Sequence, residues 1–436
     1  MKESFDLNFD IKRLGKPITS SPLKNIHFVS DDEKILFDIN YKNVLNHSKQ
    51  NSCGDMVALE KAGPRELIYF QPEKVIAGIV TCGGLCPGLN NVIRSLVMQL
   101  HYQYKVKKIM GFRYGYRGLF SHSNESPLYL TVEDVEDIHY FGGSMLGCSR
   151  GSSDTVKIVD GLEHYGVNVL FTIGGDGTIK GSIDIEEEVR KRELDIAVVN
   201  IPKTIDNDIP YISRSFGFQT AFSEAVESIR CAHNEAIGAP NGIGIVKVMG
   251  RSSGFIAAQT TLAQKDVNYV LVPEIDFDLD GEHGLLSELE QRLKRAKHAL
   301  IVVAEGAGQK FFEQQDTKYD LSGNKRLDDI GVYLKERIKA SFANKKIEVN
   351  VKYIDPSYII RSVPANPEDG VYCGFLAEHA VHAAMSGRTR MVIGRWNENF
   401  VNLPMDIIKA GRKKLDPNSS LWQSVLLSTG QPPLKA

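Results

Sequence analysis

Short runs of hydrophobic, mostly β-branched residues recur along the chain from about residue 73 onward. Each run is apolar at consecutive positions, which is typical of strands that helices bury on both faces. Amphipathic segments lie between the runs, such as Leu285–Lys297, where Leu286, Leu289 and Leu293 share one helical face. The runs are Val75–Val80, Val167–Ile173, Ile196–Ile201, Ile243–Val248, Tyr269–Val272 and Ala299–Val303. This alternation predicts an α/β fold built from doubly wound, mostly parallel sheets.

Glycines and acidic residues cluster directly after these runs. The clusters are Thr81–Gly84, Gly174–Thr178, Pro202–Asp208, Met249–Arg251 and Glu305–Gly306. Open parallel sheets bind ligands outside the carboxyl ends of their strands. We therefore expect these five segments to line one ligand-binding cleft.

Length and charge narrow the class of protein. A chain of 436 residues predicts roughly three units at about 150 residues each. Residues 1–72 differ from the rest, being polar and weakly periodic with turn signals such as Asn51–Gly54, and we expect an extension that packs on the main body or on a partner. The net charge of −2 gives no electrostatic footprint for nucleic acid.

The same sequence gives no sign of a membrane or secreted protein. No apolar run reaches the roughly 18 residues of a membrane span, and the charged start of the chain is unlike a signal peptide. Six cysteines are too few for a disulfide framework. We expect a reduced, cytoplasmic protein in which Cys82 and Cys86 are structural thiols rather than zinc ligands.

Two glycine-rich segments predict a phosphate donor site. Gly83–Gly88 precedes a helical stretch, so its amides can approach an anion, although a tight strand–helix turn explains it as well. In Gly174–Thr178, three glycines surround Asp176, which can offer oxygen to Mg²⁺ beside phosphates. The alternative is an Asx turn, and kinases of NAD and of lipids share this pattern.

The segment Lys203–Asp208 is the strongest chemical signal. It combines a cation, a hydroxyl and two carboxylates within six positions. In an extended segment Asp206 and Asp208 would share one face, which suits a base that accepts a hydroxyl proton during phosphoryl transfer. Lys203 can balance the charge that develops on the phosphoryl group. A solvated loop is the alternative, but Ile205 makes the segment unusually apolar.

Other polar residues are weaker candidates. Arg150 matches phosphate geometry but is also an ordinary surface residue type. Met249–Arg251 offers a close backbone approach and a second arginine. Glu305 can accept hydrogen bonds from sugar hydroxyls or form a buried ion pair. Tyr358 and Arg361 have helix-like spacing, which does not by itself indicate a function.

Taken together and in order, these motifs resemble the phosphofructokinase family from about residue 75 to 395. The motifs are TCGGLCPGLN, GCSRG, GGDGT, PKTIDND, VMGR, AEG and YIIR. The resemblance is greatest to ATP-using members of the clade that is otherwise rich in pyrophosphate users. It implies two interleaved, Rossmann-like domains with mostly parallel sheets and the active site in the cleft between them.

The resemblance also implies a role for each matching residue. Asp206 would be the base that deprotonates the 1-hydroxyl of fructose 6-phosphate, with Lys203, Thr204 and Asp208 as catalytic neighbours, and Asp176 the residue associated with Mg²⁺. The nucleotide site would comprise Gly84, Arg150, Gly151, Gly175, Asp176, Gly177 and Thr178. The sugar-phosphate site would comprise Thr204, Ile205, Asp206, Met249, Gly250, Arg251, Glu305, Lys352, Tyr358 and Arg361.

One position bears on the phosphoryl donor. In pyrophosphate users the glycine motif reads Gly-Gly-Asp-Asp, and the second Asp obstructs the α-phosphate of a nucleotide. This chain has Gly177 there, so the resemblance implies ATP as the co-substrate. Lys203 resembles the pyrophosphate-type lysine, however. The alternatives are a pyrophosphate-dependent fructose 6-phosphate 1-phosphotransferase and a catalytically silent regulatory subunit.

Two positions depart from the bacterial pattern. Gly242 and Lys352 stand where bacterial members have arginines at the sugar-phosphate site. We expect a nucleotide-binding domain at 73–217 and 360–412, a sugar-phosphate domain at 218–359 and 413–436, and an extension at 1–72. The expected assembly is a homo-oligomer, a dimer or tetramer, that binds neither nucleic acid nor membrane.

Overall fold

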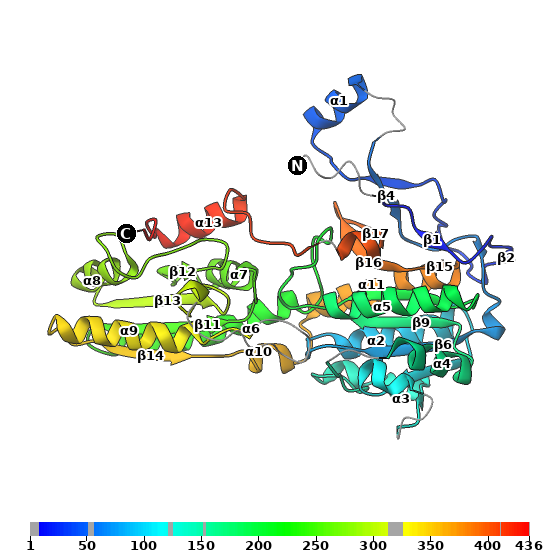
Figure 1. Cartoon of the computed structure of the whole chain (residues 1–436), viewed down its shortest axis with the longest axis horizontal. Coiled ribbons are helices and arrows are strands. Elements are labelled where there is room, and N and C mark those ends of the chain that lie inside the picture. The colour runs from blue at the N-terminus through cyan, green and yellow to red at the C-terminus, as the bar shows by residue number, and fades with distance from the viewer. Residues whose placement is uncertain are drawn as a thin grey trace. The chain divides into compact units, whose positions relative to one another are not determined.

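The chain folds into two compact units, which are described separately below. The computed structural model describes residues 8–50, 56–120, 125–150, 154–312, 326–409 and 411–435. Unit 1 comprises residues 1–204, 209–216 and 364–412, and unit 2 comprises residues 205–208, 217–363 and 413–436 (Figure 1). The predicted assignment of one domain to nucleotide and one to sugar phosphate stays a prediction, since contacts within the chain say nothing of ligands.

Unit 1 is built on a sheet of nine strands. Their spatial order is β3 (Lys34–Leu36), β4 (Ala58–Lys61), β17 (Asn399–Pro404), β16 (Met391–Trp396), β10 (Ala197–Pro202), β9 (Val169–Gly174), β6 (Ile76–Thr81), β7 (Lys108–Phe112) and β8 (Leu128–Tyr129). The five strands from β16 to β7 are parallel, and the outer strands pair antiparallel. The sheet is doubly wound and mostly parallel, as the hydrophobic runs predict.

Unit 1 has helices in the N-terminal extension and on the parallel part of this sheet. They are α1 (Tyr41–Gln50), α2 (Leu89–Met98), α3 (Val132–Val135), α4 (Thr155–Tyr165), α5 (Asp176–Lys191), α11 (Pro367–Met385) and α12 (Met405–Ile408), with a π turn at Gln99–Gln103 and 3₁₀ turns at Pro72–Lys74, Gly115–Leu119 and Ile138–Tyr140. Helix α11 packs on β9, β10 and β16 together with α2, and α5 packs on β9 and β10 together with α4.

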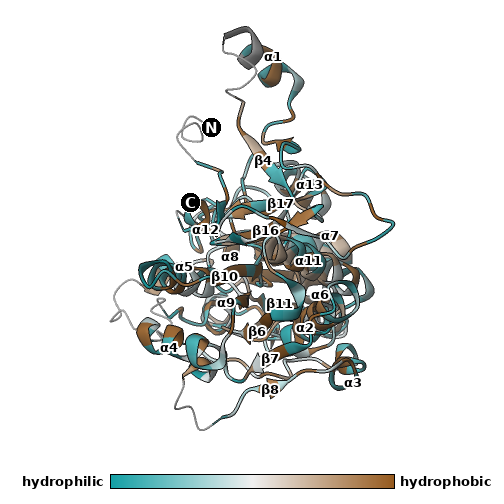
Figure 2. Cartoon of the chain, turned by 90° about the vertical axis from the view of Figure 1, so that its right-hand side faces the viewer, coloured by the Kyte–Doolittle hydropathy of each residue, from teal (hydrophilic) through white to brown (hydrophobic). Residues whose placement is uncertain are grey.

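Hydropathy follows this layering. Figure 2 shows hydrophobic colour along β6 and β10 and mixed polar and apolar surfaces on α4 and α5. Most of α11 from Leu376 onward is buried, whereas Phe375 is exposed. Among the described residues, no helix has the length and apolar character needed to cross a membrane.

The N-terminal extension packs on unit 1. Strand β4 adds to β17, and β3 adds to β4, so the extension lengthens the main sheet. Strand β1 (Lys12–Arg13) pairs with β15 (Arg388–Thr389), and β2 (Thr19–Ser20) pairs with β5 (Leu67–Ile68). The expected turn at 51–54 lies outside the described residues.

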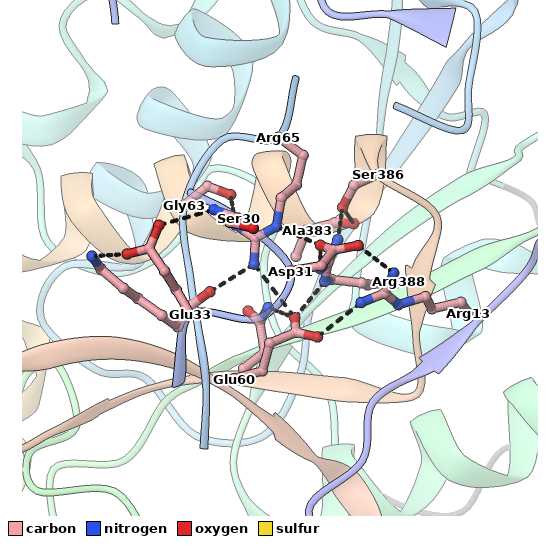
Figure 3. A network of polar contacts seen from close by, with 12 residues as sticks. Arg13, Ser30, Asp31, Glu33, Glu60, Gly63, Arg65, Ala383, Ser386 and Arg388 are labelled. Atoms are coloured by element: carbon pink, nitrogen blue, oxygen red, sulfur yellow. Dashed lines mark hydrogen bonds and ion pairs between the residues drawn. The ribbon is translucent and has the colours of Figure 1, made fainter. Parts of the chain in front are cut away.

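A cluster of charged side chains, of which Arg388 and Glu60 are buried, fastens this extension. Arg388, which is almost fully buried, donates hydrogen bonds to Glu60 at 2.5 Å and Asp31 at 2.7 Å, and Arg13 also contacts both carboxylates (Figure 3). Burial acts to raise the pKa of Asp31 and of Glu60, but the arginines outweigh burial and hold each pKa below its usual range. The extension is therefore tied to the body by ion pairs as well as by strand pairing.

Unit 2 has a smaller, wholly parallel sheet. Its order is β12 (Tyr269–Leu271), β13 (His298–Ala304), β11 (Gly242–Val248) and β14 (Asn350–Ile354). The helices are α6 (Phe218–Ile237), α7 (Phe255–Gln264), α8 (Leu285–Ala296), α9 (Ile330–Asn344), α10 (Ile359–Ser362) and α13 (Ser420–Thr429), with a 3₁₀ turn at Gln309–Phe312.

The two faces of this sheet are covered by different helices. Ile243 and Ile245 on β11 share a core with residues of α8 and α9. Gly244, which points to the other face, lies against the backbone of α6. Because alternate residues of a strand point to opposite faces, both faces are buried. This explains why the run Ile243–Val248 is apolar throughout.

Candidate active site

In unit 1, three neighbouring parallel strands end at segments of the predicted active site: β6 and β9 precede predicted nucleotide-binding residues, and β10 precedes the predicted catalytic segment Lys203–Asp208. Strands β6, β9 and β10 are adjacent, and their register places Thr81 beside Ile173 and Gly174 beside Pro202. The segments that follow these residues therefore start side by side at the carboxyl edge of the sheet. This is the position where parallel α/β sheets bind ligands.

The first glycine loop is held by backbone and lysine contacts. The amide of Gly83 donates to the carbonyl of Ser149 at 2.9 Å, so the GCSRG segment runs beside it. Lys203 Nζ donates to the carbonyl of Gly84 at 2.7 Å. Arg150 directly follows Ser149 and is exposed, whereas Gly151 lies outside the described residues. The structure thus brings Gly84, Arg150 and Lys203 to one edge of unit 1.

The second glycine motif begins a long helix. Gly175 is the N-cap of α5, and Asp176 is its first residue. A helix N-terminus of this kind favours phosphate, because its free amides and its dipole point at the anion. Thr178 is buried, whereas a Cβ atom built on Gly177 would meet no atom within 4 Å. Open space therefore exists at the position that the sequence analysis linked to the donor.

Asp176 has the chemistry expected of a magnesium-associated carboxylate. Its side chain is 30% exposed and lies 3.3 Å from Lys180 Nζ and 3.6 Å from Arg412. Mg²⁺ takes oxygen ligands and usually keeps one or two carboxylates, several waters and phosphate oxygens. An accessible carboxylate at a phosphate-type helix end fits a metal ion that arrives on the nucleotide.

Lys203 is buried among thiols. Its residue is only 6% exposed. Burial raises the pKa of the nearby Cys82 thiol to about 12, and the charge of Lys203 offsets this only in part. Cys86 is also buried, and its thiol donates to the carbonyl of Phe216. Both cysteines are therefore packed in the interior of unit 1.

The segment Lys203–Asp208 crosses from unit 1 to unit 2 between Thr204 and Ile205. The expectation that it is extended is wrong, because Asn207 has a left-handed φ of 53°. An Asn side chain tolerates this conformation better than most residues. Asp206 and Asp208 therefore do not share a face in the way that alternate residues of a strand do.

Contacts on both sides fix this segment. Ser215 Oγ donates to the carbonyl of Thr204 at 2.7 Å within unit 1. Ser253 Oγ donates to the carbonyl of Asp206 at 3.0 Å within unit 2. Ile205 and Asp206 are both less than a tenth exposed. The predicted base thus lies in a well-ordered turn and not in a solvated loop.

In unit 2, the ends of β11 and β13 meet. The amide of Glu305 donates to the carbonyl of Val248 at 2.9 Å, and the amide of Arg251 donates to Glu305 Oε1 at 3.0 Å. The carboxylate of Glu305 therefore accepts a hydrogen bond from a backbone amide. The sequence alternative, a buried ion pair, has no support among the contacts of the described residues.

The loop after β11 is conformationally strained. Gly250 has a φ of 140°, and a Cβ atom there would lie 2.3 Å from the carbonyl oxygen of Ser253. Arg251 has a left-handed φ of 45°. Strained backbone of this kind persists only where the surroundings hold it, and it gathers at ligand sites. Met249, Gly250, Arg251 and Glu305 are brought together at this carboxyl edge.

The remaining sugar-site candidates lie along β14 and beyond it. The Arg361 guanidinium stacks over the Tyr358 ring at 4.8 Å on α10. Lys352 lies within β14, beside Gly244 rather than at the strand's end, with its ammonium 3.6 Å from Glu235. The structure thus separates Lys352 from the loop at Met249–Arg251. That all candidates of both units line one cleft stays a prediction.

Gly242, which stands where the bacterial pattern has an arginine, has no room for a side chain. A Cβ atom at this position would lie 2.0 Å from the carbonyl oxygen of Ala236, at the end of α6. Real Cβ atoms do not approach so closely, so no larger residue fits without moving α6. The arginine of the bacterial pattern therefore cannot stand here in the present backbone.

Three residues near Asp206 escaped the sequence analysis. Ser253, Glu274 and Lys413 all contact the turn or its supports. Ser253 follows the VMGR motif and could have been included with it. Glu274 and Lys413 are remote in sequence and belong to no motif, so only the fold shows their location.

Comparisons with known proteins match most of the chain to one family. Residues 76–384 match the phosphofructokinase family. An ATP-dependent 6-phosphofructokinase of Borreliella burgdorferi is 50% identical over 98% of this chain and 97% of its own length. A protein of the same name from Amycolatopsis methanolica is 46% identical, over 97% of this chain and 94% of its own length.

Solved structures show the same fold. A pyrophosphate-dependent phosphofructokinase from Marinobacter aquaeolei matches with a TM-score of 0.65 at 17% identity, over 83% of this chain and 92% of its own. A Pichia pastoris phosphofructokinase matches with a TM-score of 0.63 at 18% identity, over 81% of this chain and 37% of its own. With half the chain or more matched by the family and close relatives along nearly its whole length, the chain belongs to the phosphofructokinase family.

Proposed function

We propose that this protein transfers the terminal phosphoryl group of MgATP to the 1-hydroxyl of fructose 6-phosphate, giving ADP and fructose 1,6-bisphosphate, as a glycolytic enzyme. The observation that carries the proposal is identity of 46–50% to proteins named ATP-dependent 6-phosphofructokinase along nearly the whole chain. The open space at Gly177, beside the helix N-terminus that suits phosphate, supports ATP as the donor.

In the proposed reaction, the 1-hydroxyl oxygen attacks the γ-phosphorus and the bond to the β-phosphate oxygen breaks. Asp206 accepts the hydroxyl proton, and Thr204 and Asp208 are its neighbours at the acceptor. Lys203 adds positive charge beneath the loop at Gly84 and neutralises the phosphates. Catalysis of this kind consists mainly of positioning and charge stabilisation.

The other candidate residues divide by unit. On the donor side, Gly84, Arg150, Gly151 and Gly175–Thr178 bind the nucleotide, and Asp176 meets the Mg²⁺ that the nucleotide carries. On the acceptor side, Ile205, Met249, Gly250, Arg251, Glu305, Lys352, Tyr358 and Arg361 bind the sugar phosphate. We place the enzyme in the cytoplasm as a homo-oligomer, a dimer or tetramer.

A pyrophosphate-dependent phosphotransferase is the second candidate, because Lys203 is the type of residue that pyrophosphate users carry. Purified protein should be assayed with ATP and, in parallel, with pyrophosphate at equal concentrations of fructose 6-phosphate. Turnover with ATP supports the proposal. Turnover with pyrophosphate alone contradicts ATP as the donor. The absence of turnover with either donor favours a catalytically silent regulatory subunit.

The role of Asp206 has its own test. Asp206→Asn removes the base but keeps the size of the side chain, so we expect kcat to fall by at least about 100-fold, within the usual range for general base catalysis. The KM for fructose 6-phosphate should change much less, because the interaction lost acts in the transition state. A variant with nearly normal kcat would remove Asp206 from this role.

A further inference from the structure

The turn that carries Asp206 contains a backbone conformation that few residues other than glycine adopt. Asn207 occupies the left-handed region with a φ of 53°. For a residue other than glycine this costs free energy, so the surrounding structure must supply the restraint. The turn at residues 205–208 belongs to unit 2 by its contacts. The restraint is therefore to be sought among the side chains of that unit.

Lys413 contacts this turn twice. Its Nζ donates to Asn207 Oδ1 at 3.1 Å, and its backbone amide donates to the carbonyl of Asp208 at 2.7 Å. The ammonium also lies 5.2 Å from the centre of the Phe255 ring. A single residue, far along the chain, thus binds both the residue with left-handed backbone and the one after it.

The supports of the turn are joined to one another. Glu274 Oε1 accepts the amide of Leu415 at 2.8 Å and the amide of Gly254 at 3.0 Å. Gly254 follows Ser253, whose hydroxyl donates to the carbonyl of Asp206. The contacts therefore form a closed ring from Asp206 through Ser253 and Glu274 to the segment of Lys413 and back to the turn.

The charge of Lys413 is poorly solvated where it lies. Burial lowers the pKa of its ammonium to about 8, although the carboxylate of Asp208 acts in the opposite direction. A lysine whose charge is disfavoured by burial contributes little to stability through that charge. Its two hydrogen bonds to the turn are instead suited to hold that turn in place.

We propose that Lys413 is a positioning residue of the phosphoryl-transfer reaction, which holds Asp206 in place through Asn207 and Asp208 without touching the substrate. This inference rests on the proposed function, in which Asp206 is the base. Displacing a reacting group by about 1 Å can cost about 100-fold in rate. The ring of contacts is suited to prevent such a displacement.

The first test replaces the ammonium but keeps the packing of the side chain. In Lys413→Met we expect kcat to fall at least about tenfold, with the KM for fructose 6-phosphate changed less than about threefold, because loss of positioning acts on the transition state. The melting temperature should stay the same or rise, since a desolvated charge is removed. Lys409→Met, at an exposed lysine four residues earlier in the sequence, is the matched control and should behave as wild type.

The second test asks whether Lys413 acts through Asn207. Asn207→Gly keeps the left-handed backbone accessible and removes the side-chain acceptor. If the pathway is correct, the double variant Lys413→Met/Asn207→Gly has a kcat no lower than that of the less active single variant. The reason is that both changes remove the same hydrogen bond. Multiplicative losses in the double variant would overturn the proposed pathway.

Asp206→Asn is measured alongside to separate the two proposals. If Asp206→Asn loses activity while Lys413→Met keeps kcat within twofold of wild type, the positioning role is wrong and the proposed function stands. If the lower kcat of Lys413→Met is accompanied by a lower melting temperature, Lys413 has a structural role and the inference fails. If Asp206→Asn keeps its kcat, Asp206 is not the base and the positioning role of Lys413 falls with it, whereas the proposed phosphoryl transfer is still decided by the assay with the two donors.

Discussion

Gly177 and Lys203 are the two residues of unit 1 from which the sequence predicts the phosphoryl donor. Lys203 is buried and bonded to the carbonyl of Gly84, so its charge lies beneath the glycine loop. A charge in that place serves any polyphosphate. Gly177, in contrast, borders open space on α5, where a side chain would project freely. We infer that Gly177 discriminates between donors and that Lys203 does not.

The change Gly177→Asp should therefore impair use of ATP. We expect kcat/KM for ATP to fall by about 100-fold, because placing like charges together costs several kcal/mol. The melting temperature should stay the same, since nothing lies within 4 Å of the new Cβ atom. Gly177→Ala, which adds bulk without charge, is the control and should retain most of the activity. Equal losses in both variants would assign the effect to size instead.

At this scale the sequence predicts residue types better than conformations. Asp176 and Gly177 could be found because they follow a hydrophobic run, and the carboxyl ends of parallel strands are where ligands bind. The left-handed backbone of Asn207 could not be found, since the restraint comes from Lys413, which lies far along the chain. A contact between remote segments leaves no local pattern.

Among the elements, the N-terminal extension shows how neighbours impose structure. Strands β3 and β4 are short and carry Lys34, Glu60 and Lys61, so no alternation of polar and apolar residues marks them. They become strands because β17 presents an open edge. The strands with long apolar runs were predictable from their composition, whereas these depend on a partner that only the fold supplies.

The ion pairs of the extension should make the protein sensitive to acid. The pKa values of Asp31 and Glu60 are lowered in the folded protein, so the unfolded chain binds protons first as the pH falls. Their stabilising contribution is complete above about pH 5 and is lost progressively as the pH falls through about 4. Urea unfolding at a series of pH values should show this decline.

The variant Glu60→Gln tests the source of that decline. At neutral pH it should lower the free energy of unfolding by about 3–5 kcal/mol, the usual cost of removing one partner of a buried ion pair. Its further loss of stability in acid should be smaller than in wild type. Glu33→Gln, at an exposed carboxylate that pairs with Lys61, should change little. Equal pH profiles for wild type and Glu60→Gln would refute the assignment.

In the whole molecule, the chain passes repeatedly between the two units, so each unit is completed by a segment that comes late in the sequence. Residues 364–412 complete unit 1, and residues 413–436 then return to complete unit 2. In that last segment Trp422 and Val425 are buried on α13, which packs against α7, and Leu434 joins the core of unit 2 (Figure 1). Gln431 bonds both the amide and the carbonyl of Val270, covering the outer strand β12.

A chain that ends at Ser419 should therefore destabilise unit 2 while keeping Lys413 and Leu415. Losing three buried apolar side chains removes about 4.5–9 kcal/mol at roughly 1.5–3 kcal/mol each, which corresponds to a drop of at least about 9 °C in melting temperature. Limited proteolysis should then cut within residues 217–363 before it cuts unit 1, since uncovered β12 and its core open first. A chain that ends at Leu434 keeps these contacts and should melt as wild type. First cleavage in unit 1, or equal melting of the two chains, would show that α13 does not support unit 2.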